Sequence, residues 1–441
     1  MSEEGNALSM RVAVASVSSP LEVGADRAPQ AADDLAALLK EAGCEIVRLG
    51  TIDTAEKAVA AGRTMAEQHV CCAALTATSW YEDYLVLDLL EECSVPVLLW
   101  SLPGMETGAL CGCQQLSCYL KQLGRPYRCV YGTFEAQQQR QQALVFVRAA
   151  ALMRRLRRAR IGFGGHHVAG MTETAANEII LKKAIGPRIV PLDVPGLLSR
   201  VAEMTDGEAA EFWRQVCAKA ADCKVSQADG LDSMKMYLAM KELVVQHRLD
   251  ALTVGCYPHL MGRVCLAASL LADQGVPFAC EGDVNGAVGQ LMLSLLTSEP
   301  THNTDWLEPL EDGSVVLTHC GSGSFSLAED QSGITLAPVR LMDQGVCALF
   351  TARPGPVTLI NVIACADRYQ IALLEGQAVS TDMVFPGNPL RVHFSQQTSD
   401  LIDWIHNEGV GHHWMAGYGH FGGEIRQWSS IVGNSVRLIE P

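Results

Sequence analysis

The sequence predicts an α/β protein with two α/β domains on parallel sheets, followed by a β-rich, barrel-like C-terminal domain. Up to about Ser322, short strand-like runs alternate with amphipathic helical segments, a pattern typical of a parallel sheet covered by helices. After that point, β-rich runs separated by turn residues dominate, which indicates a small antiparallel barrel or sandwich. The chain also has 441 residues, more than a single hydrophobic core usually serves.

The first domain is expected over residues 1–159. Short β-rich runs alternate there with longer helical runs, which is typical of a parallel sheet with helices on both faces. The expected strands are Arg11–Ser16, Glu45–Leu49, Cys72–Ala77 and Pro96–Trp100, and the expected helices are Ala31–Ala42, Thr54–His69, Tyr81–Glu92 and Gln137–Arg158.

The second α/β domain is expected over residues 160–322 and repeats this alternation. Gly162, Gly164 and Gly165 follow its first strand, but the third glycine of a dinucleotide-binding fingerprint is missing, so that function is not indicated. The expected strands are Arg160–Phe163, Ile189–Pro191, Ala251–Val254 and Pro277–Ala279, and the expected helical segments are Thr174–Ala184, Gly207–Arg248, Leu260–Asp273 and Asn285–Thr297.

The third domain is expected over residues 323–441. Turn residues such as Pro354-Gly355 separate its β-rich runs, and one helix, Thr398–Asn407, precedes a segment rich in glycine and histidine. The expected strands are Gly333–Pro338, Val357–Ala364, Arg368–Ser380 and Pro389–Phe394.

Composition and charge narrow the class of function. The formal net charge is −16, which opposes binding to nucleic-acid phosphates. The one arginine-rich cluster is expected to be the solvated end of a helix. The N-terminus is polar and acidic, and no apolar run reaches the length of a membrane helix, so we expect a cytoplasmic protein. The 16 cysteines lie mostly in apolar runs and are expected to be free thiols that pack in the interior.

A carboxylate follows the last strand of the second domain, in the stretch A-C-E-G-D. The carboxyl edge of a parallel sheet is where ligands bind, which makes Glu281 a candidate for function. Asp283 stands just before the next expected helix and is the better candidate for its N-cap, so Glu281 has no structural duty of that kind.

Further polar residues interrupt apolar sequence at T-H-N-T-D-W, L-T-H-C-G and G-H-H-W-M-A-G-Y-G-H. Taken alone, Asp305 could be an ordinary loop aspartate and His319 a core histidine. In an extended segment His412 and His413 point to opposite faces, so only one of them is expected to enter a given site. Two carboxylates and one imidazole suit Mn²⁺ or Mg²⁺ better than Zn²⁺, although the spacing by itself is not specific.

The order and the residues of these segments resemble those of the L-fucose/L-arabinose isomerase family, in particular of its less-characterised members. W-S-L-P-G-M-E-T-G-A-L-C-G in the first domain, A-C-E-G-D-V-N-G and the C-terminal histidine segment carry the resemblance. It implies a metal site formed by Glu281, Asp305 and His413, with His319 as a further histidine near the metal. The metal implied is Mn²⁺, or another divalent cation such as Mg²⁺ or Co²⁺.

The resemblance also implies an activity. It is the interconversion of an aldose and a ketose through a cis-enediol intermediate, with Glu281 and Asp305 as the groups that move protons. A homo-oligomer is implied as well, possibly a hexamer with active sites between subunits. Trp100 is a candidate for packing against the sugar, with a core tryptophan as the equal alternative. His319 and His412 are further candidates for contacting the sugar.

Two loops depart from the family pattern. Gly165-His166-His167-Val168 stands where relatives carry an Arg-Pro-Pro-like loop, and His259 stands where relatives often have an acidic residue. His166 and His259 are therefore candidate substrate contacts for an unusual sugar. Two other functions stay open: a metal-dependent epimerase or lyase acting on a modified or acidic sugar, and a non-catalytic sugar-binding protein.

Overall fold

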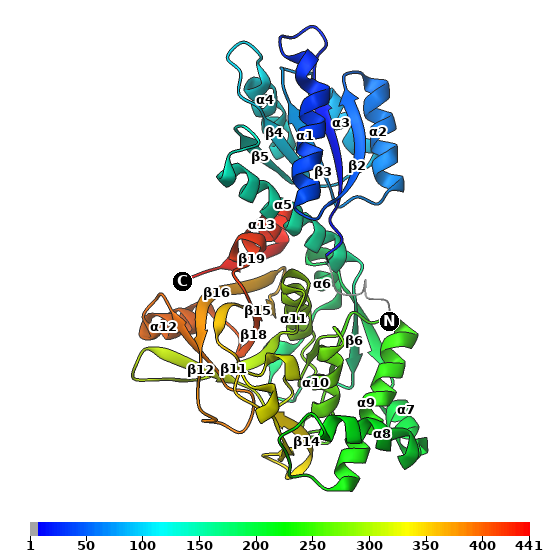
Figure 1. Ribbon diagram of the computed structural model, residues 1–441, viewed down its shortest axis with the longest axis vertical. Coiled ribbons are helices and arrows are strands. Elements are labelled where there is room, and N and C mark those ends of the chain that lie inside the picture. Colours follow the sequence, from blue (N-terminus) through cyan, green and yellow to red (C-terminus); the bar gives the residue numbers. More distant parts are fainter. Residues whose placement is uncertain (1–7) are drawn as a thin grey trace. The chain divides into compact units, whose positions relative to one another are not determined.

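The computed structural model describes residues 8–441, which form two compact units (Figure 1). The first unit comprises residues 8–155 and 423–433, and the second comprises 156–422 and 434–441. The predicted domain boundary after residue 159 lies close to the change of unit, whereas the boundary predicted after residue 322 lies within the second unit. Among the described residues, no helix combines the length and apolar character needed to cross a bilayer.

A five-stranded parallel sheet forms the centre of the first unit. The strand order is β2-β1-β3-β4-β5, and the buried strands β1, β3 and β4 are apolar because helices cover them. The strands are β1 (Arg11–Val17), β2 (Glu45–Ile52), β3 (Cys72–Ala77), β4 (Val97–Ser101) and β5 (Tyr127–Tyr131). The predicted parallel α/β fold of this region is confirmed.

The helices of this unit match the predicted alternation, with two additions, at residues 109–122 and 422–432. They are α1 (Ala28–Glu41), α2 (Ala55–Glu67), α3 (Tyr84–Glu92), α4 (Ala109–Gln122), α5 (Gln137–Arg157) and α13 (Gly422–Val432). The sequence analysis did not predict α4, because its glutamines, glycine and scattered cysteines make a weak helical pattern; its buried face carries Cys113, Leu116 and Leu120.

The second unit contains a four-stranded parallel sheet in the order β10-β9-β6-β7. Its strands are β6 (Arg160–Gly164), β7 (Arg188–Leu192), β9 (Ala251–Val254) and β10 (Phe278–Ala279). Its helices are α6 (Glu178–Ala184), α7 (Val194–Glu203), α8 (Asp206–Cys217), α9 (Gln227–His247), α10 (Cys265–Asp273) and α11 (Val284–Thr297). The predicted long helical stretch is therefore two helices, separated by the short strand β8 (Asp222–Cys223).

The β-rich part of this unit is a seven-stranded sheet in the order β15-β18-β11-β12-β17-β16-β19. Because β15 also pairs with β16, the pairings of six strands return to their starting point. The strands are β11 (His302–Pro309), β12 (Ser314–Thr318), β15 (Gly355–Ala364), β16 (Tyr369–Val379), β17 (Leu390–Phe394), β18 (His413–Tyr418) and β19 (Val436–Ile439). A smaller sheet joins β8 to β13 (Thr335–Val339) and β14 (Gln344–Leu349), and α12 (Thr398–Glu408) completes the unit.

Helix α11 joins the parallel sheet to the β-rich sheet. All but its last residue are buried, and it contacts β9 and β10 as well as β15 and β18. Gly286 and Gly289 permit this close packing, because a Cβ at either position would lie within 3.1 Å of the Met415 side chain. The carboxyl end of β10, just before α11, is thereby held against strand β18.

Candidate active site

Glu281 lies in a tight turn between β10 and α11. Its φ of 66° is in the left-handed region, which is unfavourable for a residue with a side chain, and Gly282 follows with a φ of 72°. A Cβ on Gly282 would lie 2.4 Å from the carbonyl oxygen of His166, so only glycine fits there. The Glu281 carbonyl accepts a hydrogen bond from the Val168 amide, at 3.2 Å, which ties the turn to the loop after β6.

Three adjacent strands of the β-rich sheet carry the partners of Glu281. Asp305 on β11 is directly opposite His413 on β18 and opposite Thr318 on β12. His319 follows Thr318 at the end of β12. Since opposite residues of antiparallel strands are neighbours, pairing alone brings residues over a hundred positions apart in sequence to one place.

Four side chains converge at this place, and each histidine approaches both carboxylates. Ligand atoms of Glu281, His319 and His413 lie within 4.8 Å of one another, whereas Asp305 forms such a group with His412 and His413. The Nε2 atom of His413 lies 3.1 Å from Glu281 Oε2 and 3.8 Å from Asp305 Oδ1. The Nε2 atom of His319 lies 3.6 Å from the same Glu281 oxygen and 3.9 Å from Asp305 Oδ2. The predicted ligands Glu281 and Asp305 thus both lie beside His413, but in two different groups of ligand atoms, and His319 belongs to the group of Glu281.

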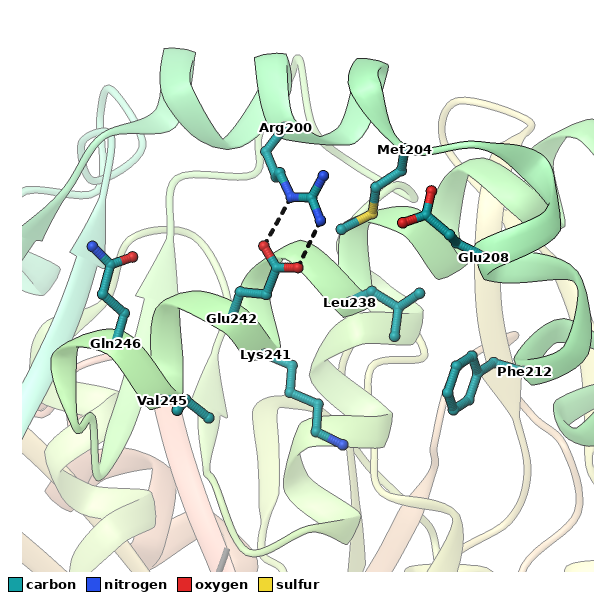
Figure 2. A pocket seen from close by; sticks show the side chains of 9 residues that line it. All are labelled: Arg200, Met204, Glu208, Phe212, Leu238, Lys241, Glu242, Val245 and Gln246. Atoms are coloured by element: carbon teal, nitrogen blue, oxygen red, sulfur yellow. Dashed lines mark hydrogen bonds and ion pairs between the residues drawn. The ribbon is translucent and has the colours of Figure 1, made fainter.

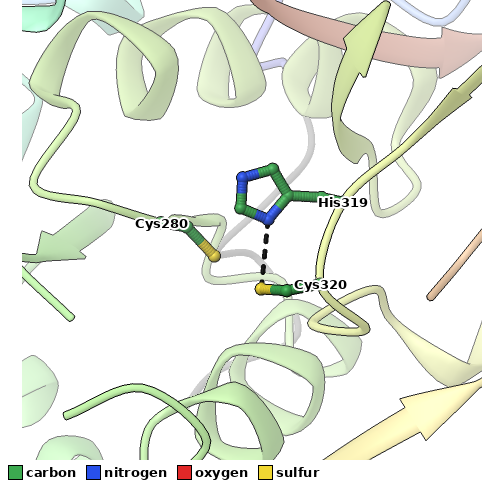
Figure 3. Close-up of side chains that lie close together, drawn as sticks. All are labelled: Cys280, His319 and Cys320. Carbon is green, nitrogen blue, oxygen red and sulfur yellow. Dashed lines mark hydrogen bonds between the residues drawn. The ribbon is translucent and has the colours of Figure 1, made fainter. Parts of the chain in front are cut away.

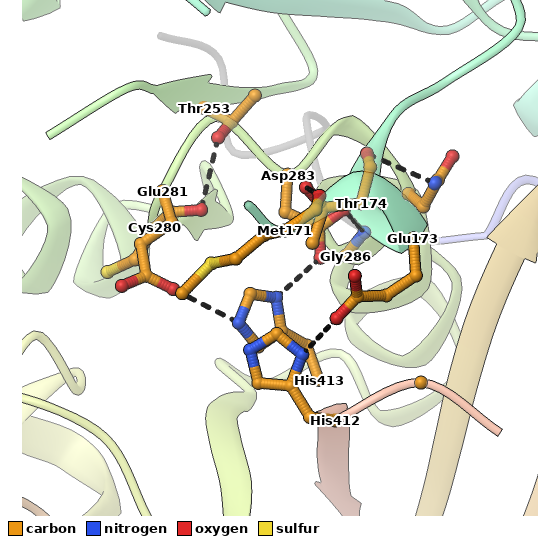
Figure 4. A network of polar contacts seen from close by, with 12 residues as sticks. Met171, Glu173, Thr174, Thr253, Cys280, Glu281, Asp283, Gly286, His412 and His413 are labelled. Carbon is orange, nitrogen blue, oxygen red and sulfur yellow. Dashed lines mark hydrogen bonds and ion pairs between the residues drawn. The ribbon is translucent and has the colours of Figure 1, made fainter. Parts of the chain in front are cut away.

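Asp283 holds His413 from the other side (Figure 4). One of its oxygens accepts from the Gly286 amide at 2.8 Å, which confirms the predicted N-cap of α11. The other lies 2.8 Å from Nδ1 of His413, and both side chains are nearly fully buried. A carboxylate on Nδ1 fixes the ring and favours a free electron pair on Nε2, as in many metal-binding histidines.

The pKa values of these groups reflect their mutual contacts. Burial alone would raise the pKa of Glu281, but hydrogen bonds and positive charge from His319 and His413 lower it to about 2. Burial would lower the pKa of His413, but its bonds to Asp283 and Glu281 raise it to about 10. The pKa of His319 is likewise raised, against the effect of burial, by Cys280 and Asp305. Positive charge is therefore strongly favoured among these carboxylates.

The arrangement fits a divalent cation. An ion about 2.1 Å from each ligand separates its ligands by roughly 3 to 4 Å, and the donor atoms here are separated by 3.1 to 3.9 Å. The buried Oδ1 of Asp305 has no hydrogen-bond partner in the described part of the chain, as expected for an atom that serves as a ligand. Carboxylate and imidazole ligands together suit Mn²⁺, Mg²⁺ or Co²⁺.

His412 lies beside this group and is more exposed than His413. It precedes β18, so strand alternation does not separate the two rings, whose centroids are 4.0 Å apart. Its Nδ1 lies 2.6 Å from a Glu173 oxygen, and it has a nitrogen within 4.8 Å of ligand atoms of both Asp305 and His413. His412 is thus close enough to contact a bound molecule.

The remaining predicted substrate contacts lie in three other places. His166 and His259 are exposed, on the loops that follow β6 and β9, and these loops leave the same edge of the sheet as the Glu281 turn. Trp100 belongs to the other unit, where its ring is fully buried and its Nε1 donates to the Gly132 carbonyl at 2.8 Å.

A small pocket of about 160 Å³ opens next to the convergent residues. Glu281, Asp305 and His319 form part of its wall, together with Arg340 and Phe385. A larger cavity of about 710 Å³ lies among α7, α8 and α9 (Figure 2), where the Glu242 carboxylate is already paired with Arg200. No group of potential metal ligands was found among the described residues around that cavity, so the smaller pocket is the candidate active site.

Free thiols border the site on its inner side. Cys280 and Cys320 lie near His319, whose Nδ1 is 3.1 Å from the Cys320 sulfur (Figure 3). Together these three side chains form a second group whose ligand atoms lie within 4.8 Å of one another. His319 thus faces carboxylates with one ring nitrogen and a thiol with the other. All 16 cysteines are free, as predicted, but not all pack in the interior: eight are buried, and four, including Cys111 and Cys118, are exposed.

Sequence reasoning missed some of the residues around the site. The contact of Asp283 with His413 could have been predicted from the sequence. A carboxylate two residues after a candidate ligand is well placed to support another ligand. The contacts of Glu173 and Arg340 had no such signal. Glu173 lies in a short 3-10 helix and Arg340 in a turn, and only the folded chain brings them near the site.

No protein-family model matches the chain. It is similar to curated proteins named sulfoquinovose isomerase. Those of Priestia aryabhattai and Priestia megaterium are each 24% identical over 362 residues, which covers 78% of this chain and 80% of theirs. That of Alkalicoccus urumqiensis is 23% identical over 365 residues, covering 79% of this chain and 81% of its own. None of these names refers to L-fucose isomerase, so that resemblance stays a prediction.

These relatives bear on the predicted activity. All four of the matching curated proteins carry the name of an isomerase that acts on a sugar. The prediction that the chain is an enzyme of the aldose–ketose isomerase class is therefore confirmed.

Proposed function

We propose that this protein is a metal-dependent isomerase that interconverts the aldose and ketose forms of a sulfonated hexose. Glu281, Asp305 and His413 would hold a divalent cation, Mn²⁺ in the first instance, with His319 beside it. The observation that carries this proposal is that His319 and His413 each lie 3.1 to 3.9 Å from both carboxylates, beside a pocket.

The reaction moves hydrogen between two adjacent carbons. A carboxylate removes the proton from the carbon next to the carbonyl group, which gives a cis-enediol, and a proton is then returned to the former carbonyl carbon. Glu281 and Asp305 are the groups on this chain suited to carry it. The pKa of Glu281, lowered to about 2, keeps that carboxyl ionised at neutral pH, as a ligand of a cation must be. A divalent cation, when bound, supplies Lewis-acid stabilisation of negative charge on the substrate oxygens.

The other predicted residues would contact the sugar. His412, held by Glu173, and the exposed His166 and His259 are side chains through which hydroxyl groups could be recognised. Trp100 remains a predicted contact that needs its own test, because its ring is buried.

The substrate class rests on the relatives. Sulfoquinovose is a hexose with a sulfonate on C6, and four similar proteins are named for its isomerisation. The unusual loops at residues 165–168 and 256–260 agree with a substrate other than a plain neutral sugar. A cytoplasmic location and a homo-oligomer, possibly a hexamer with shared active sites, belong to the same proposal, and light scattering on the purified protein tests the assembly.

Proton NMR in D₂O tests the function directly. Mn²⁺-loaded protein is incubated with sulfoquinovose, glucose, L-fucose and L-arabinose, and formation of the ketose is followed together with deuterium uptake next to the carbonyl. EDTA-stripped protein and Glu281→Gln are the controls. Exchange with ketose formation, absent from both controls, is expected for sulfoquinovose.

The two other functions give different results. An epimerase or lyase acting on an acidic sugar would yield a product without aldose–ketose exchange. A binding protein would retain the sugar and give neither exchange nor product. Either result with sulfoquinovose would overturn the proposal.

A further inference from the structure

Arg340 is the one side chain with a permanent positive charge among the described residues that line the small pocket. It lies between strands β13 and β14, at the turn of their hairpin. The same pocket contains the Glu281 and Asp305 carboxylates. A divalent cation on these carboxylates would offset their charge at the reacting end of a sugar. The anionic group at the other end, in a chain of net charge −16, needs a cation of its own.

The Arg340 guanidinium has no acidic partner. No ion pair or hydrogen bond of this side chain occurs within the described residues, whereas other arginines of this unit, such as Arg263 and Arg353, are paired with carboxylates. Its contact is with an aromatic ring: the guanidinium carbon lies 4.8 Å from the centroid of Phe385, which also lines the pocket.

The guanidinium carbon lies over the Phe385 ring, and its N–H groups have no partner among the described residues. An arginine held by its face against an aromatic ring keeps its N–H groups free in their plane, where they can bind two oxygens of one anion. The ring also limits the freedom of the side chain, so less entropy is lost when an anion binds. An unpaired and oriented cation in the wall of a substrate pocket is suited to recognising an anion.

We propose that Arg340, oriented by Phe385, is the site that binds the terminal anionic group of the sugar, a sulfonate in the first instance. This inference rests on the proposed function, because it places the reacting end of the sugar at Glu281 and Asp305. Arg340 would then set specificity: it selects hexoses with a charged C6 group over neutral ones, and takes no part in proton transfer.

The test compares Arg340→Gln and Arg340→Lys with the wild type on two substrates of the same carbon skeleton. Sulfoquinovose carries the sulfonate and 6-deoxyglucose lacks it. Loss of a hydrogen-bonded ion pair is expected to raise KM for sulfoquinovose roughly 10- to 100-fold in Arg340→Gln, with kcat changed less than about threefold. Values for 6-deoxyglucose should stay the same. Arg340→Lys should recover part of the affinity, because lysine keeps the charge but not the paired geometry.

Arg368→Gln is the matched control, because Arg368 is an exposed arginine of the same unit that pairs with Asp367 and does not line the pocket. It should behave as wild type on both substrates. An Arg340→Gln variant with unchanged KM for sulfoquinovose, or with equal losses on both sugars, would overturn the specificity role.

Binding without turnover separates this proposal from the proposed function. Calorimetry with methyl α-sulfoquinovoside and methyl α-glucoside, neither of which can open to an aldose, measures recognition alone. Preference for the sulfonated glycoside that is lost in Arg340→Gln would support the anion site even if no isomerisation occurred. Isomerisation of sulfoquinovose by wild type with no preference between the glycosides would overturn the anion site and leave the isomerase standing.

Discussion

Replacement of Asp283 by asparagine tests whether the site is organised as the contacts indicate. Asparagine has nearly the same shape and can still accept the hydrogen bond from the Gly286 amide, so α11 should keep its N-cap. Its NH₂ group, however, would face Nδ1 of His413 in place of the carboxylate oxygen now 2.8 Å away. A donor at that position requires an unprotonated Nδ1, so the ring proton moves to Nε2 and points at Glu281.

The expected result is weaker metal binding. Removing a carboxylate that supports a histidine ligand typically lowers metal affinity 10- to 100-fold, or about 1.4 to 2.7 kcal/mol. Stability of the metal-free protein should fall by about 2 kcal/mol, because the buried Asp283–His413 pair is lost. Titration calorimetry with Mn²⁺ on EDTA-stripped protein gives the Kd, and urea unfolding gives the stability.

Ser226→Ala is the control for the capping function. Ser226 caps α9 by accepting from the Asp229 amide at 3.1 Å, and it lies far along the chain from the site residues. Its loss should cost about 1 kcal/mol of stability and leave the Mn²⁺ Kd unchanged. A folded Asp283→Asn protein whose Kd is within twofold of wild type would refute the idea that Asp283 positions His413.

Three further outcomes are expected. The Glu281→Gly variant should lose isomerisation but be at least as stable in urea unfolding as Glu281→Gln. The left-handed backbone at this position costs a residue with a side chain about 1 to 2 kcal/mol, and glycine removes that cost. Burial and the nearby charge of Arg353 lower the pKa of His302 in the folded protein to about 3. As the pH falls, His302 is therefore protonated in the unfolded chain at a higher pH than in the folded protein. Stability should therefore drop by up to about 1.4 kcal/mol per pH unit between pH 6.5 and 3, and His302→Asn should flatten that slope in urea titrations at each pH. Trp100→Phe, which loses the bond to Gly132, should cost about 1 kcal/mol in thermal unfolding, and a change in KM would instead support the predicted sugar contact.

The strands and helices of the α/β regions could be predicted because the spacing of the apolar residues and the length of each run indicate the same kind of element. Strands β1, β3 and β9 are short apolar runs, and the helices between them are longer and amphipathic, so pattern and structure match. The β-rich region was harder. Strand β11 begins as H-N-T-D, four polar residues that alternate poorly, and it forms because β12 and β18 supply its hydrogen bonds.

The site was predicted in part for a similar reason. Glu281 could be predicted as a site residue from its place at the end of a buried strand. His413 could be predicted from its segment rich in glycine and histidine. The approach of Asp305 to His413 depends on the register of β11 against β18, which no local pattern determines. The contacts of Glu173 and Arg340 depend on loop conformation, which is set by packing against residues far away in sequence.

The two faces of His319 bear on which metal the protein would acquire in a cell. Carboxylates surround its Nε2 and attract a hard ion such as Mn²⁺, but its Nδ1 meets Cys320, with Cys280 close by. Thiolates prefer Zn²⁺, Cd²⁺ or Cu⁺, and Zn²⁺ binds most ligands more tightly than Mn²⁺. If the proposed cation site is right, Cys280, His319 and Cys320 form a competing site for thiophilic ions beside it. An excess of thiophilic ions should turn His319 toward the cysteines, so activity would depend on how well the cell keeps such ions scarce.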